Sequence, residues 1–131
     1  MDWKENRKLM DNAIKKDVIP ILRKMGFNGS FPHFRRKLKT KIDILGFQFS
    51  QFGQGFYINI AVSPLNGVTF NSGSHFPAKN IKYYQCINQI RIGPSIFNYE
   101  DGNYENVTAQ IITSFDEAER WWANHNLIKN A

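Results

Sequence analysis

The stretch Ile42–Val62 reads IDILGFQFSQFGQGFYINIAV, and its pattern decides the fold. Two runs of alternating apolar and polar residues flank a segment with Gly53 and Gly55, which is typical of two strands joined by a turn. One face is expected to hold Leu45, Phe47, Phe49, Phe56, Ile58, Ile60 and Val62, and the other Gly46, Gln48, Ser50, Tyr57, Asn59 and Ser63. This alternation predicts an antiparallel sheet with one face packed and the other free.

Helices are expected at both ends of the chain. Between residues 3 and 25, apolar residues recur at three- and four-residue spacing, and Pro20 predicts a kink near Lys16–Asp17. Ser114 and Glu117 form a capping-box pattern, which predicts a last helix running to about Asn126. Residues 107–112 fit either a strand or a helix.

The remaining segments complete a small sheet. Strands are predicted over 31–38 and 82–92, the latter ending at Gly93-Pro94, and a long loop is predicted over 63–80. A short strand at 96–99 is a further candidate. We therefore predict an α+β fold, with an N-terminal helix and a C-terminal helix packed on one face of a four- to five-stranded antiparallel sheet. Residues 1–131 form a single domain in this prediction, with a disordered tail at 127–131.

Composition excludes several classes of site. The chain has 131 residues, a net charge of +6 and one cysteine, Cys86, so neither an intrachain disulfide nor a cysteine-cluster zinc site can form. We expect no metal site, because His33, His75 and His125 share no metal-ligand spacing. No apolar run approaches the roughly 20 residues of a membrane span and no signal peptide is visible, so a cytoplasmic protein without a membrane partner is expected.

Three segments resemble a bacterial family, the domain of unknown function 4304 family. They are IPILRKMGF at 19–27, Phe34-Arg35-Arg36 with the strands at 42–50 and 56–60, and Cys86 with Arg91-Ile92-Gly93. Family members often have Asn where this chain has Gly46. The resemblance implies a small α+β domain, and it implies no activity.

Polar residues of the predicted free face are the candidate site. We expect a surface formed by Arg36, Gln48, Ser50, Tyr57, Asn59, Gln89 and Arg91. One interpretation is a solvated face with cross-strand hydrogen bonds, and the other is an anion- or peptide-binding surface anchored by the two arginines. The second predicts a non-enzymatic protein-binding module that uses this face and loop 63–80, in an immunity- or adaptor-type role by analogy.

A basic hairpin supports an alternative function. Five cations lie within seven residues: Arg35, Arg36, Lys37, Lys39 and Lys41. With Tyr57 they would suit a nucleic-acid-binding module, although the same lysines in a solvated hairpin would also discourage edge-to-edge pairing. No motif indicates a nucleophile, a phosphate loop or a dinucleotide site, so we expect no catalytic residue and no cofactor. An enzyme with a dispersed polar site around Arg91 is the third alternative.

Overall fold

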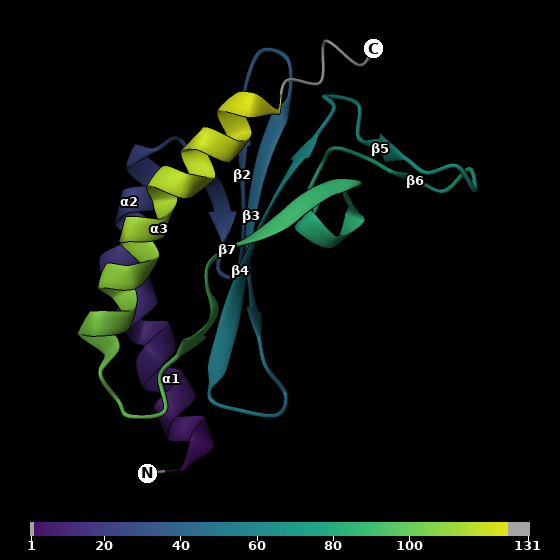
Figure 1. Ribbon diagram of the computed structural model, residues 1–131. Helices are drawn as coiled ribbons and strands as arrows, with labels where there is room; N and C mark the ends of the chain where they lie inside the picture. The colour runs from purple at the N-terminus through teal and green to yellow at the C-terminus, as the bar shows by residue number, and fades with distance from the viewer. Residues whose placement is uncertain (1, 126–131) are drawn as a thin grey trace.

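Figure 1 shows the computed structural model, in which a five-stranded antiparallel sheet carries its long helices on one face. The structure describes residues 2–125, so the tail predicted at 127–131 lies outside the described residues. The strands run in the order β1-β2-β3-β4-β7. Their bounds are β1 Asn28–Ser30, β2 His33–Lys37, β3 Ile42–Phe49, β4 Gly55–Ser63 and β7 Asn88–Asn98. The predicted α+β fold is confirmed.

The N-terminal helix has three parts, α1 (Trp3–Ala13), the π-helical turn η1 (Ile14–Val18) and α2 (Ile19–Lys24). The π-helical turn lies where Pro20 predicts a kink, because proline lacks the amide that would bond to the carbonyl four residues earlier.

The C-terminal helix α3 (Tyr104–Asn124) starts earlier than predicted. Asn103 caps it by accepting a hydrogen bond from the amide of Asn106, at 3.2 Å. The predicted start at Ser114 is wrong, because the buried Ser114 hydroxyl donates to the Ile111 carbonyl inside the helix. Residues 107–112 are therefore helical.

The main core lies between these helices and the sheet. Apolar side chains of both helices meet Leu45, Phe47, Phe56 and Ile58 of the central strands. Trp122 of α3 is fully buried, and its indole N–H donates to the Ala61 carbonyl of β4 at 3.0 Å. This bond ties the last turns of α3 to the sheet.

The opposite sheet face is only partly free, which corrects the prediction of an open face. The strands β5 (Val68–Thr69) and β6 (His75–Phe76) form a hairpin, and the 3-10 turn η2 (Tyr83–Gln85) follows them. Both elements lie on the side away from the helices (Figure 1). They cover a second core cluster made of Ile42, Ile44, Ala61, Val68, Ile81, Tyr83 and Cys86.

Two further predicted segments, 63–80 and 82–92, also have different boundaries in the structure. Residues 63–80 contain a hairpin rather than an unstructured loop, and residues 82–87 turn over the sheet before β7 begins at Asn88. Strand β7 continues past Gly93-Pro94 to Asn98, because a register shift against β4 absorbs the break.

Candidate functional site at the polar sheet face

An open cleft of about 540 Å³ lies on the sheet face away from the helices. Its floor comes from β3, β4 and β7, and η2 forms one wall. The lining residues are Gln48, Asn59, Tyr83, Tyr84, Gln89, Ile90 and Arg91. The register explains the grouping, because Gln48 pairs with Tyr57 and Asn59 with Arg91, which places all four side chains on one face.

Arg91 is held in place by its neighbours. Its Nε donates to Asn59 Oδ1 at 3.4 Å and its Nη2 to Gln48 Oε1 at 3.3 Å. Its guanidinium lies 3.8 Å above the ring of Tyr57. Asn59 in turn donates to Gln48 Oε1 at 3.1 Å. The result is an oriented cation with N–H groups left over for an anion.

The remaining predicted residues differ in how they meet the cleft. Gln89 lines it and donates to the Cys86 carbonyl at 2.9 Å. Asn59 lies at its base and is only 5% exposed, so the prediction that it faces solvent is wrong. Ser50 lies in the β3–β4 turn, where its hydroxyl accepts a hydrogen bond from the Phe52 amide and does not line the cleft.

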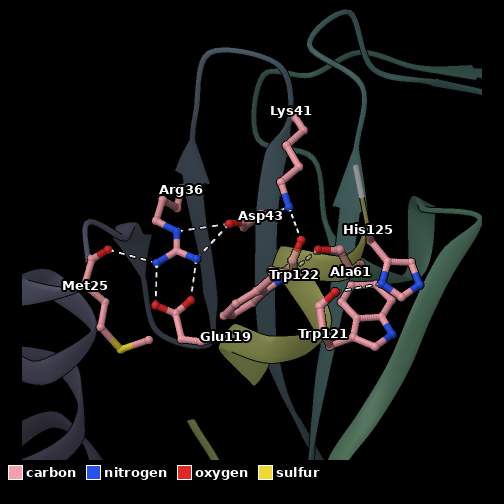
Figure 2. Close-up of polar contacts among 9 residues, drawn as sticks. All are labelled: Met25, Arg36, Lys41, Asp43, Ala61, Glu119, Trp121, Trp122 and His125. Atoms are coloured by element: carbon pink, nitrogen blue, oxygen red, sulfur yellow. Dashed lines mark hydrogen bonds and ion pairs between the residues drawn. The ribbon is translucent and has the colours of Figure 1, made fainter. Parts of the chain in front are cut away.

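Arg36 lies on the opposite face of the sheet, so its predicted place beside Gln48 and Arg91 is wrong. It shares a face with Phe34, two residues earlier, whose ring is fully buried under the helices. Figure 2 shows its guanidinium between Asp43 of β3 and Glu119 of α3, with Nη2 at 2.8 Å and 2.6 Å from their carboxylates. Nη1 also donates to the Met25 carbonyl at 3.1 Å. Burial alone would lower the pKa of Arg36, but the two carboxylates outweigh it and raise that pKa.

Lys41 completes this buried ionic cluster. Its Nζ lies 3.1 Å from Asp43 Oδ1 and donates to the Trp122 carbonyl (Figure 2). Arg36 and Lys41 are therefore neutralised on the helix side of the sheet. Of the five hairpin cations, Lys37 and Lys39 are exposed, and Arg35 is half-buried on the other face with a 3.2 Å bond to the Ile81 carbonyl.

The two sheet faces differ in charge. Between residues 18 and 99 the only acidic residue is Asp43, and its carboxylate is buried on the helix side. All other acidic residues lie in the N-terminal helix, in the turn before α3, in α3 itself, or at the N-cap Asp2. Among residues 2–125, no carboxylate lines the cleft, whereas Arg91 does. This absence of acidic residues is a sequence signal that could have marked the face as a site for anions.

Three residues of the cleft were missed by the sequence prediction: Tyr83, Tyr84 and Ile90. Tyr83 lies over Gly46, because a Cβ built on Gly46 would meet the Tyr83 ring at 2.4 Å. Burial raises the pKa of Tyr83, and Arg91 opposes that rise, so the phenol stays protonated at neutral pH. The pair of adjacent tyrosines after Lys82 was the only sequence signal for Tyr83 and Tyr84.

Cys86, the one cysteine of the chain, belongs to the second core cluster. Burial raises the pKa of the Cys86 thiol to about 12, so the thiolate needed for nucleophilic attack is not populated at neutral pH. Within residues 2–125, no cluster of three or more His, Cys, Asp or Glu side chains could hold a metal ion. None of the helices that the structure describes is long and apolar enough to cross a bilayer.

Comparison with known proteins gives one match. Residues 3–125, nearly the whole chain, match the family model described as a domain of unknown function (DUF4304). No curated protein and no solved structure matched the chain.

Proposed function

The chain belongs to the domain of unknown function 4304 family, a description that names no activity, and we propose that it is a non-enzymatic protein-binding module. It binds an acidic segment of a partner protein across the cleft at Arg91. The observation that carries this proposal is an oriented arginine in a cleft with no carboxylate. A fixed guanidinium binds a carboxylate with less loss of conformational entropy than a mobile one.

The surroundings of the cleft suit a protein partner. Tyr84 and Ile87 are 55% and 61% exposed, and tyrosine and arginine are both enriched at interface hot spots. A separate groove is lined in part by Val68 and Thr69 of β5 and by Ile87, so the exposed Ile87 lies beside the β5–β6 hairpin. The segment 63–80 would therefore extend the contact, in a cytoplasmic immunity- or adaptor-type setting.

Nucleic acid is the less favoured partner. Arg91 already covers one face of the Tyr57 ring, so that face is not free to stack on a base. Arg36 and Lys41 of the basic hairpin are bonded to Asp43 on the helix side. Both features reduce the groups that would hold bases and phosphates.

The test uses labelled peptides and fluorescence anisotropy. A peptide of alternating Glu and Ser should bind the full chain, and a matched Gln and Ser peptide should not. Arg91→Gln should weaken binding about tenfold, the size of one charge-assisted hydrogen-bonded contact. Arg120→Gln, an exposed arginine of α3, is the charge-matched control and should leave binding unchanged.

Two results would overturn the proposal. Equal weakening by the two arginine variants would show attraction to net charge rather than to the cleft. Tighter binding of a single-stranded oligonucleotide than of the Glu peptide at equal charge, lost with Lys37→Gln, would favour the nucleic-acid alternative.

A further inference from the structure

A second, smaller pocket of about 260 Å³ lies at the other edge of the sheet. Arg35 and Lys37 of β2 and Lys79 of the segment after β6 line it, together with Asn28 and Asn80. Leu65 contributes an apolar wall, and no carboxylate of the described part of the chain lines the pocket. It shares no lining residue with the cleft at Arg91.

Arg35 is a fixed part of this pocket. It is half-buried, pairs with Asn28 of β1 and Ile44 of β3 across the ladder, and its Nη1 donates to the Ile81 carbonyl at 3.2 Å. Burial lowers the pKa of Arg35. A bound anion would favour the charged form and offset that loss of hydration.

The opposite wall is a tight turn. The Ile81 amide donates to the Ala78 carbonyl at 3.2 Å, which makes Lys79 and Asn80 the central residues of the turn. Asn80 adopts a φ of 60°, the left-handed conformation that few residues other than glycine tolerate. The hydrogen bond from Arg35 to Ile81 therefore fixes the turn that presents Lys79 and Asn80.

The pocket cations are not neutralised by the protein. Within residues 2–125, Arg35, Lys37 and Lys79 form no ion pair. Burial lowers the pKa of His33 on the same face, and the positive charges of Lys82 and Arg35 lower it further. The two charges also make the potential near the pocket positive. Three unpaired cations around one recess favour a ligand with more than one negative charge.

We propose that this pocket binds the phosphoryl group of a small phosphorylated molecule. A phosphate monoester offers two negative charges and several acceptor oxygens, which match one fixed guanidinium, two ammonium groups and two amides. The volume is just below the range of about 300–1,000 Å³ typical of small-molecule sites, so it suits a phosphoryl group with a short attached moiety.

The test is a titration of the full chain, followed by the amide signals of residues 79–81 in nitrogen–proton NMR spectra. Inorganic phosphate and a nucleoside monophosphate are added at constant ionic strength, with chloride as the blank. Both phosphates should shift these signals saturably, and the double variant Lys37→Gln, Lys79→Gln should weaken binding about tenfold. Lys24→Gln with Lys15→Gln, two exposed lysines of the N-terminal helix, is the matched control and should bind normally.

Three outcomes would overturn the proposal. The amide signals could stay unmoved by millimolar phosphate, or the two double variants could lose binding equally. A single-stranded oligonucleotide could also bind more tightly per phosphate than the monophosphate, which would make the pocket a contact for a polymer. Arg91→Gln should leave phosphate binding intact, so failure here is separable from failure of the acidic-peptide proposal.

Discussion

At the scale of single residues, Gly46 and Tyr83 fix the shape of the cleft. The ring of Tyr83 occupies the space that a Cβ on Gly46 would take, at 2.4 Å from Cδ2. A glycine in the middle of a strand often marks such a close approach. The turn η2 can rest on the sheet only because this position has no side chain.

Gly46→Ala is therefore expected to destabilise the fold and to disturb the cleft. Overpacking of this kind costs about 1–3 kcal/mol, because Tyr83 must move and η2 with it. Urea denaturation would measure the cost. Gly53→Ala is the control, since a Cβ there meets no atom within 4 Å. Equal stability of the two variants would contradict the prediction.

His33 makes stability depend on pH. Its Nδ1 is buried with no hydrogen-bond partner among the described residues, and burial, Lys82 and Arg35 lower its pKa from the ordinary 6.5. The unfolded chain thus binds a proton at a higher pH than the folded chain does. The contribution of His33 to the free energy of unfolding is complete above about pH 6.5, and it is lost as the pH falls toward the folded pKa.

The prediction concerns the difference between wild type and His33→Gln. Urea denaturation over a pH series should show wild type losing stability below pH 6.5 more steeply than the variant. Parallel curves would mean that His33 does not carry the effect.

At the scale of secondary-structure elements, the two ends of α3 have different anchors. Asn103 caps its start, and Trp122 fixes its last turns to β4. The capping-box pattern at Ser114 lies in the middle of the helix, where the hydroxyl bonds to a carbonyl within the same turn.

Asn103→Ala should lower the free energy of unfolding by about 1 kcal/mol, because the Asn106 amide loses its acceptor. Thermal unfolding followed by circular dichroism would measure the change. Thr113→Ala, whose exposed hydroxyl bonds to the Ala109 carbonyl, is the comparison and should change stability by less than about 0.5 kcal/mol. A larger loss of stability in Thr113→Ala than in Asn103→Ala would contradict the role of Asn103 as the N-cap of α3.

The elements differ in how far their own residues determine them. The alternation in β3 and β4 predicts their faces correctly for Leu45, Phe47 and Gln48, because a strand has a period of two. The same period, counted from Phe34, would have placed Arg36 under the helices. The burial of Asn59 could not be predicted in this way, since it depends on η2 folding back over the sheet from more than twenty residues away.

At the scale of the whole molecule, charge is divided between the two sides of the sheet. The helix side holds Asp43 and Glu119 with the cations they neutralise, and the other side presents cations in two recesses without carboxylates. The ionic cluster joins β2, β3 and α3 to the C-cap of α2, because Arg36 also bonds to the Met25 carbonyl (Figure 2). A single carboxylate, Asp43, is shared by Arg36 and Lys41.

Asp43→Asn is expected to cost about 3–5 kcal/mol, because it leaves the buried Lys41 ammonium without a carboxylate and Arg36 with one in place of two. Urea denaturation followed by tryptophan fluorescence would report the loss through the buried Trp122. The control is Asp11→Asn, which removes the more exposed i,i+4 pair with Arg7 and should cost less than about 1 kcal/mol. Adding Lys41→Met to Asp43→Asn should recover part of the stability, because it removes the uncompensated charge. A cost at Asp43 no larger than at Asp11, or no recovery in the double variant, would mean that packing rather than this ionic cluster fixes α3 against the sheet.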